Sequence, residues 1–160
     1  MALKSGHVSI SLARRIIPDA FTVEHYPLNQ LLDTSNIPRD VEIWGFVDNH
    51  THTSTTPFNL NVSTGFDIGL GPANRQRTRD DVHLEQQYIL LAKMTLDVSK
   101  LSYAQSIPVS NGILRGGISI RAILVRVVNN WSQPTRPDST ACLYRVLAHG
   151  KVDERVESAY

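Results

Sequence analysis

The stretch that decides the fold is Ile118–Asn129, which reads ISIRAILVRVVN. β-Branched and other apolar residues dominate it, and such residues favour the pleated surface of a buried strand. Gly116 and Gly117 precede it, as turn residues at the start of a strand do. We therefore expect a central strand here. Arg121 and Arg126 fall on its opposite faces, so at least one of them must reach solvent, pair with an acid or face a partner.

Similar patterns occur in several other segments of the chain. Strands are predicted at residues 8–13, 40–48, 58–63, 88–98 and 141–148. Asp40–Asp48 (DVEIWGFVD) has apolar residues at odd and even positions, which predicts a strand buried on both sides. Residues 82–88 fit either a helix or a strand, and we expect a break or bend near Gln86. A short helix is predicted at Pro27–Asp33, because proline suits the first position of a helix.

These elements predict the fold class. About seven strands, without the alternation of strands and helices that builds parallel sheets, are typical of an all-β domain. We expect a mainly β fold, an antiparallel β-sandwich, jelly-roll-like fold or barrel, with one or two short helices. The length of 160 residues suits a single domain covering residues 1–160. Within it, residues 1–18 form either an arm or the first strand.

Composition excludes several function classes. The chain has 16 Lys and Arg against 15 Asp and Glu, so it is not a strongly basic nucleic-acid binder. No apolar run is long enough to span a membrane, and we expect no secretory signal. Cys142 is the single cysteine, which excludes an internal disulfide framework and favours a reducing, cytoplasmic setting. Its apolar neighbours predict a buried, inert thiol.

Charge is segregated along the chain. Residues 1–18 carry a net charge of +3, residues 19–74 carry −6, residues 75–79 carry +3, and the remainder carries +1. Arginine outnumbers lysine twelve to four, and the planar guanidinium suits interfaces. Such blocks can place acidic and basic faces on opposite sides of a domain and steer association. Alternatively, folding interleaves the blocks and the segregation has no consequence.

The candidate binding residues are arginines. Arg75, Arg77 and Arg79 alternate in RQRTR, so in an extended segment they project to one side and can bind phosphates or an acidic patch. Arg14 and Arg15 form a second basic pair. The alternative interpretation of residues 75–79 is a solvated loop.

One motif resembles a metal site. Gly45–Thr53 reads GFVDNHTHT, and it resembles the segment that ends the first barrel strand of amidohydrolase-type metalloenzymes and the opening of polymerase-and-histidinol-phosphatase-type phosphoesterases. The resemblance implies that His50 and His52 ligate a metal ion. Those families need a larger barrel with alternating helices, which this chain does not predict. We therefore expect a polar loop here, with His50 and His52 as the metal candidates.

Together these features predict a non-enzymatic, self-assembling structural or interaction protein that needs no cofactor. An all-β chain rich in Asn, Ser, Thr and Arg resembles small virus-encoded structural proteins of matrix or coat type, located in the cytoplasm of a host or in a virion. We expect a homo-oligomer, with nucleic acid, a nucleoprotein or a membrane surface as further partners. The alternatives are a nucleic-acid- or phosphate-binding β-barrel module using residues 75–79, and a small metal-dependent hydrolase using His50 and His52.

Overall fold

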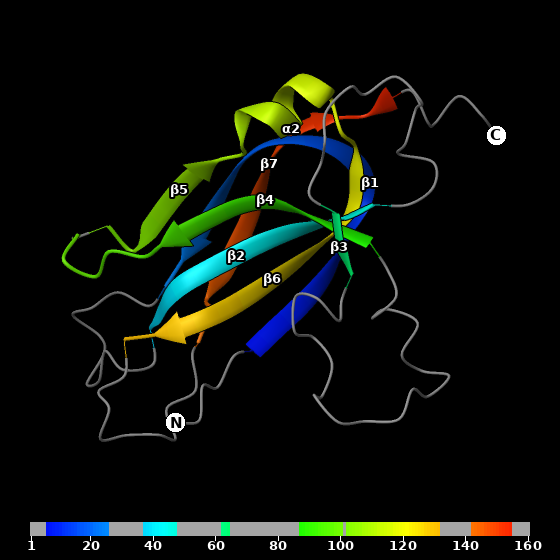
Figure 1. The fold of residues 1–160 in the computed structure, drawn as a ribbon. Helices are drawn as coiled ribbons and strands as arrows, with labels where there is room; N and C mark the ends of the chain where they lie inside the picture. The colour runs from blue at the N-terminus through cyan, green and yellow to red at the C-terminus, as the bar shows by residue number, and fades with distance from the viewer. Residues whose placement is uncertain are drawn as a thin grey trace, which may run out of the picture.

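The computed structural model describes residues 6–25, 37–47, 62–64, 87–100, 102–131 and 142–154. These residues form seven strands and one short helix (Figure 1). The elements are β1 (Gly6–Glu24), β2 (Pro38–Val47), β3 (Val62–Thr64), β4 (Gln87–Thr95), β5 (Ala104–Pro108), α2 (Asn111–Gly116), β6 (Ile120–Asn130) and β7 (Arg145–Val152). The fold is mainly β, as predicted, and forms a nearly closed antiparallel β-sandwich.

The strand β1 joins the two layers of the sandwich. The strand order is β3-β4-β2-β6-β1-β5, with β7 also paired to β1. Residues Gly6–Ser11 pair with β6, and from Ile16 onward β1 pairs with β7 and β5. A register shift separates these two parts between Ser11 and Ile16. In Figure 1, β1 bends over the top of the molecule and so passes from one layer to the other.

Both strands with two-sided apolar patterns are interior strands, as predicted. β6 lies between β2 and β1, and β2 lies between β4 and β6. Val41 and Ile43 of β2 point into the main core, whereas Trp44 is buried on the opposite side of the sheet. The arginines of β6 also divide: Arg126 forms an ion pair with Glu42, and Arg121 is exposed.

A β-bulge explains the apolar pattern of β4. Its pairing with β2 shifts by one residue, because Ile43 lies opposite Ala92 and Trp44 lies opposite Leu90. Even-numbered residues before the bulge, such as Leu90, therefore pack on the Trp44 side, whereas after it Met94 packs into the main core. The strand predicted at residues 88–98 is confirmed, although β4 ends at Thr95.

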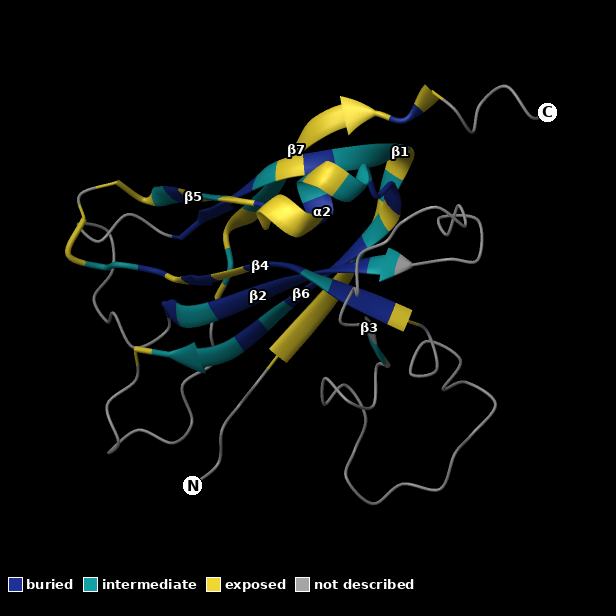
Figure 2. Ribbon diagram, turned by 45° about the horizontal axis from the view of Figure 1, so that its top comes forward, coloured by how far each residue is buried: buried dark blue, intermediate teal, exposed yellow. Residues whose placement is uncertain are grey.

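The main core lies between the two layers. Figure 2 shows buried residues concentrated in β2, β4 and β6 and in the second half of β1. Its largest fully buried side chains include Phe21, Ile43, Leu91, Leu96 and Ile120. The helix α2 contributes Ile113 to this core. The core thus holds the backbones of β1, β2, β4 and β6 in place, and polar side chains of these strands point outward from it.

Other predicted boundaries were wrong in part. β1 continues to Glu24, well beyond the predicted residues 8–13, and β7 begins at Arg145 rather than at residue 141. The pattern did not predict β5 or α2. Gly117 adopts a left-handed conformation with φ of 57°, so the Gly116–Gly117 pair ends a helix instead of opening a strand directly.

Several predictions fall on residues outside the described ranges. These are the helix at residues 27–33, most of the strand at residues 58–63, and the ambiguous segment before Gln87. Within the described ranges, no helix has the length and apolar character needed to cross a membrane.

Candidate functional site

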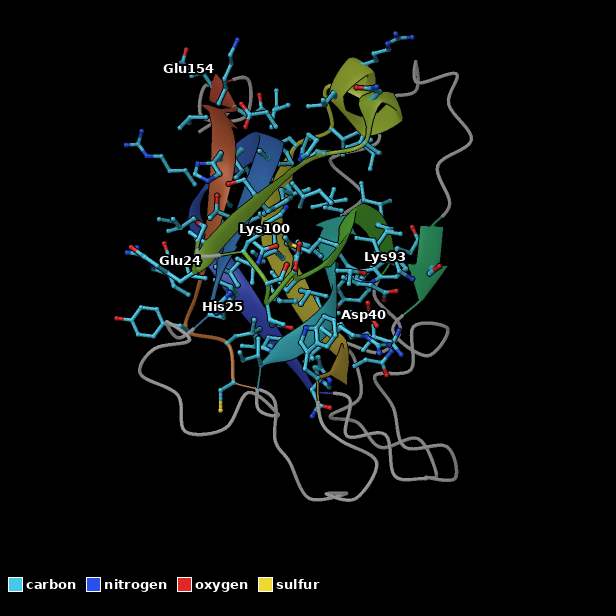
Figure 3. The ribbon with its side chains drawn as sticks, turned by 90° about the vertical axis from the view of Figure 1, so that its left-hand side faces the viewer. Glu24, His25, Asp40, Lys93, Lys100 and Glu154 are labelled. Carbon is cyan, nitrogen blue, oxygen red and sulfur yellow. The ribbon has the colours of Figure 1, made fainter. Side chains whose placement is uncertain are left out.

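A polar surface covers the outer side of the layer formed by β5, β1 and β7. In β1, Phe21 and Val23 point into the core, so Thr22 and Glu24 point outward. The register places Ser106 of β5 opposite Thr22. It places Arg145 of β7 opposite Glu24. Figure 3 shows Glu24 on this layer and Asp40 on the other side of the sandwich.

Glu24 and Arg145 form a two-point ion pair. Arg145 Nε and Nη2 each donate a hydrogen bond of 2.8 Å, one to each carboxylate oxygen of Glu24. These hydrogen bonds lower the pKa of Glu24, and the charge of Arg145 adds to the effect, whereas burial opposes it. Glu24 is buried, but the Arg145 side chain is 57% exposed. The buried carboxylate therefore orients a guanidinium whose remaining N–H groups reach solvent.

A second polar row lies beside this pair. The Thr22 hydroxyl is 2.7 Å from Ser106 Oγ and 2.8 Å from His149 Nε2. Thr22 is buried between its neighbours, while Ser106 and His149 are exposed. The row thus offers two accessible polar groups at fixed positions on either side of β1.

Two exposed tyrosines flank the end of β1. His25 N donates to Tyr103 O at 2.9 Å, and Tyr144 N donates to Glu24 O at 3.1 Å, so one tyrosine lies on each side of this strand end. Tyr103 is 48% exposed and Tyr144 is 62% exposed. The pKa of Arg145 is raised mainly by its hydrogen bonds to Glu24 and then by the Glu24 charge, with smaller contributions from the two nearby phenols.

We call this surface the β1 face. It comprises Thr22, Glu24, Tyr103, Ser106, Tyr144, Arg145 and His149. It combines exposed aromatic rings with a fixed array of hydrogen-bonding groups, which is the usual composition of a surface that recognises a ligand.

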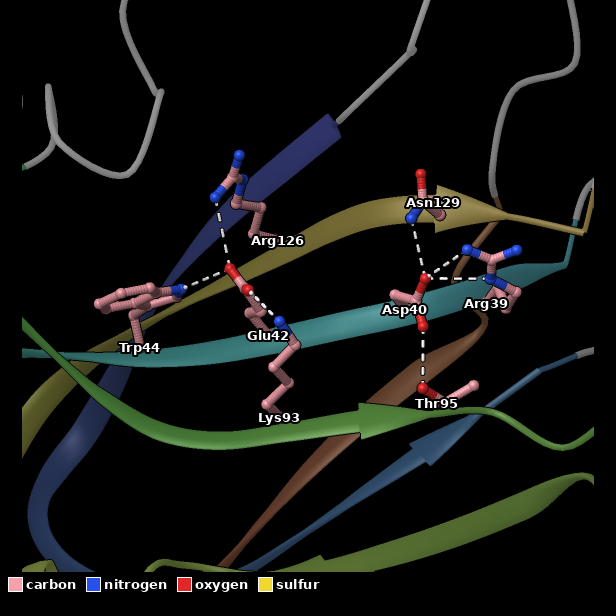
Figure 4. Close-up of polar contacts among 8 residues, drawn as sticks. All are labelled: Arg39, Asp40, Glu42, Trp44, Lys93, Thr95, Arg126 and Asn129. Atoms are coloured by element: carbon pink, nitrogen blue, oxygen red, sulfur yellow. Dashed lines mark hydrogen bonds and ion pairs between the residues drawn. The ribbon is translucent and has the colours of Figure 1, made fainter.

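The opposite side of the sandwich carries a different polar network, which we call the β2 face (Figure 4). Glu42 Oε2 accepts hydrogen bonds of 3.3 Å from Trp44 Nε1 and from Arg126. Glu42 Oε1 lies 3.2 Å from Lys93 Nζ. The Arg126 side chain is only 25% exposed, and Trp44 is buried with Leu124. Three donors therefore surround this carboxylate beside an apolar cluster.

Asp40 extends the β2 face toward the end of the sheet. It accepts hydrogen bonds from Asn129, Thr95 and Arg39 at 2.8–3.0 Å. Burial alone would raise the pKa of Asp40, but these hydrogen bonds and the Arg39 charge outweigh it, so the pKa is lowered. The Arg39 guanidinium also lies 5.9 Å from the centre of the Trp131 ring.

A cleft of about 480 Å³ separates β4 from β5. Its lining includes Lys93, Thr95, Lys100, Ser102, Gln105 and Ser106. Gln105 fixes the loop that joins the two strands, because its amide accepts from Asp97 N and donates to Asp97 O, both at 2.9 Å. Ser106 belongs to the cleft and to the β1 face, so the two surfaces are continuous.

The structure places only some of the site residues that the sequence suggested. Arg14 and Arg15 lie in the segment of β1 between its two paired parts, and both make contacts. Arg75, Arg77 and Arg79 lie outside the described residues, as do His50 and His52, and their roles stay predictions. The residues that the structure describes contain no cluster of three His, Cys, Asp or Glu side chains able to hold a metal ion.

The prediction for Cys142 was wrong. Its side chain is exposed, because it precedes β7, which begins only at Arg145. The apolar composition of residues 141–148 predicted a strand from residue 141. Because that strand would include Cys142, its thiol was predicted to be buried.

Sequence reasoning missed the whole β1 face. The pattern of Phe21 and Val23 against Thr22 and Glu24 is the alternation of a half-buried strand and could have extended the first strand. No local pattern indicates that Arg145 meets Glu24, since 121 residues separate them.

Comparisons with known proteins agree with the fold. The family model of the Sad1/UNC-like C-terminal region matches residues 2–64, which hold β1, β2 and β3. No curated protein sequence matches the chain. Among the solved structures that match is the family 32 carbohydrate-binding module from Streptococcus pneumoniae EndoD, with 11% identity and a TM-score of 0.52. The match covers 92% of this chain and 70% of that chain, and at this identity it establishes the β-sandwich fold.

These findings correct the predicted function. Neither similarity is to a viral structural protein, so the prediction of a matrix or coat protein was wrong. The alternatives, a nucleic-acid- or phosphate-binding barrel and a metal-dependent hydrolase, do not agree with these similarities either. The solved structure is described as a binding module, which agrees with the prediction that the chain is not an enzyme. The comparisons thus indicate similarity to a β-sandwich binding module.

Proposed function

We propose that this chain is a non-catalytic carbohydrate-binding module whose ligand site is the β1 face. The observation that carries the proposal is the position of two exposed tyrosines beside a guanidinium that a buried carboxylate holds in place. The likeness of the fold to a solved carbohydrate-binding module supports the same ligand class.

The chemistry of the β1 face suits a sugar. A sugar ring presents hydroxyl groups at its edge and apolar C–H groups on its faces. Tyr103 and Tyr144 offer large, rigid surfaces for those faces at a small cost in conformational entropy. Arginine has five N–H donors, of which Glu24 occupies two on Arg145, so the others can donate to hydroxyl groups.

The row through Thr22 adds acceptors and donors at a second position. Ser106 and His149 are exposed on either side of Thr22, and hydrogen bonds to its hydroxyl hold both in place. A site that is ordered before the ligand arrives loses less entropy on binding. This row therefore favours recognition of a defined arrangement of hydroxyl groups.

Local charge favours a neutral sugar over an acidic one. The negative charge of Glu24 lies against Arg145, so the pair has no net charge, and the lowered pKa keeps Glu24 ionised at neutral pH. An acidic sugar would have to compete with Glu24 for the guanidinium. We therefore expect neutral glycans to bind more tightly than their uronic or sulfated counterparts.

The same residues do not form a set for nucleophilic catalysis. A histidine beside a hydroxyl is the beginning of such a set, but a third group must orient the histidine. Among the described residues, His149 has its hydrogen bond to Thr22 and no acidic partner. We expect bound sugars to be released unchanged.

Glycan-array screening followed by titration calorimetry tests this proposal. We expect binding to neutral glycans, and an Arg145→Ala variant should bind at least about tenfold more weakly. Arg121→Ala is the matched control, because Arg121 is an exposed arginine on β6 away from the β1 face. An absence of glycan binding would overturn the proposal. Equal affinities of the Arg145→Ala variant and the wild type would remove the site from the β1 face.

A further inference from the structure

The first part of β1 has one edge that no other described strand pairs with. Residues Gly6–Ser11 pair with β6 on one side, whereas β7 and β5 pair with β1 only from Ile16 onward. No other strand within the described ranges pairs with this first part of β1. Figure 2 shows the beginning of β1 as exposed, next to buried stretches of the neighbouring strands.

Other edges of the sandwich carry features that discourage pairing with another chain. In β5, Pro108 has no backbone N–H. At the start of the same strand, the Ser102 hydroxyl donates a hydrogen bond of 2.7 Å to the backbone oxygen of Ala104. Lys93 lies on β4 and Lys151 lies on β7. Lysine, proline and local capping are the usual ways in which edge strands avoid association. Residues 6–13, GHVSISLA, contain no lysine, arginine, acid or proline.

An incompletely covered apolar row runs along the same edge. Val8 lies opposite Val125 and Ile10 lies opposite Ile123, so both point to the core side of the sheet. Val8 is nevertheless 46% exposed, and Ile10 and Leu12 are only partly buried. Within the part of the chain that the structure describes, a strand edge without a partner strand and incompletely covered apolar side chains therefore coincide in one segment.

We propose that this edge binds the same edge of a second copy of the chain, and that the two β1 strands form an antiparallel pair. When Ile10 lies opposite Ile10 of the other copy, Val8 lies opposite Leu12 and Ser9 lies opposite Ser11. Apolar residues then face apolar residues, serines face serines, and no charged side chains within residues 6–13 oppose each other. This self-complementarity is what a two-fold symmetric interface requires.

The dimer would combine two ligand sites. The pairing edge lies within residues 6–13 of β1, and the β1 face begins at Thr22, so pairing leaves both β1 faces open. Two weak sites on one particle bind a surface that displays many ligands far more tightly than one site does. The dimer itself does not depend on the identity of the ligand.

Charge substitutions at the two serines test the pairing. The side chains of Ser9 and Ser11 are exposed in the single copy, so Ser9→Glu with Ser11→Glu should leave the fold intact. In the dimer these carboxylates oppose each other twice, and the dissociation constant should rise by at least about tenfold. The Ser9→Lys and Ser11→Lys double variant should weaken in the same way. An equimolar mixture of the two double variants should restore the dimer, because opposite charges then face each other.

Sedimentation velocity over a range of concentrations, in reducing buffer because Cys142 is exposed, measures the assembly. Ser110→Glu with Asn111→Glu is the matched control, since it adds the same charge at exposed positions at the start of α2 and should leave the dimer unchanged. A wild-type protein that stays monomeric at every concentration would overturn the proposal. So would a double glutamate variant that dimerises as tightly as the wild type. Glycan binding by the monomeric variant separates this outcome from a failure of the proposed function.

Discussion

The β1 face and the β2 face each contain a glutamate–arginine ion pair, but the two pairs differ in their surroundings. Each holds a buried glutamate against an arginine on the neighbouring strand, Glu24 with Arg145 and Glu42 with Arg126. Glu42 also accepts a hydrogen bond from Trp44 and forms an ion pair with Lys93, and the side chain of Arg126 is largely covered. Among the described residues, the Glu24 carboxylate accepts side-chain hydrogen bonds from Arg145, and more than half of that arginine side chain is exposed.

The difference teaches that accessibility, rather than the ion pair itself, separates a structural site from a binding site. On the β2 face, three donors surround Glu42 beside an apolar cluster, and the guanidinium paired with it is largely covered, so this network stabilises the fold. On the β1 face, the buried acid holds an open guanidinium next to two exposed rings. Substitutions made in matched pairs on the two faces should therefore separate loss of stability from loss of binding.

The largest effect is expected from removing Glu42. In Glu42→Ala, the buried Trp44 N–H and the mostly covered Arg126 lose their acceptor, and the free energy of unfolding should fall by about 3 kcal/mol or more. Glu24→Ala should cost less stability, because the exposed Arg145 can be hydrated instead. Urea denaturation compares the two variants. An equal or larger loss for Glu24→Ala would contradict the distinction between the faces.

The next largest effect concerns the aromatic residues. Tyr103→Ala and Tyr144→Ala should each weaken glycan binding about tenfold, or about 1.4 kcal/mol, while the free energy of unfolding changes by less than about 0.5 kcal/mol. Trp131→Ala is the counterpart on the β2 face. It should leave the affinity unchanged and lower the stability, because Trp131 Nε1 donates to Leu96 O at 3.2 Å and its ring contacts Arg39. Calorimetry and urea denaturation on the same samples decide whether the effects divide in this way.

The same contrast explains what the sequence could predict. β2 and β6 are apolar on both sides because they lie inside the sandwich, and this density of apolar residues is visible in the sequence. β5 is a five-residue edge strand, AQSIP, and too short and polar to produce a pattern. The β1 face depends on pairing between distant strands, which no local spacing records: Thr22 meets His149 across 127 residues. The sequence shows an arginine at position 145 and a glutamate at position 24, but it does not show that the two form an ion pair.

A smaller effect is expected from removing one hydroxyl on each face. Thr22→Val keeps the shape but removes the hydroxyl that Ser106 and His149 share, so we expect a loss of about 1 kcal/mol in binding. Thr95→Val removes the hydrogen bond of 2.8 Å to Asp40 on the β2 face and should affect stability alone. If both variants bind glycans equally well, the row through Thr22 does not order the site.

The smallest effect is a pH dependence that differs between the faces. The pKa values of Glu24 and Asp40 are lowered in the folded protein, so each carboxylate adds stability above its ordinary pKa, near 4.5 for Glu24 and 3.8 for Asp40. This stability is lost as the pH falls through the lowered values, because the folded state must then take up protons that the unfolded chain already holds.

Glu24→Gln should flatten the acid side of the stability curve and of the affinity curve, since Arg145 loses its charged partner. Asp40→Asn should flatten the stability curve alone. Urea midpoints and glycan affinities measured from about pH 7 down to about pH 3 test this difference. If the glycan affinity of the Asp40→Asn variant no longer depended on pH in the acid range, the β2 face would also contact the ligand.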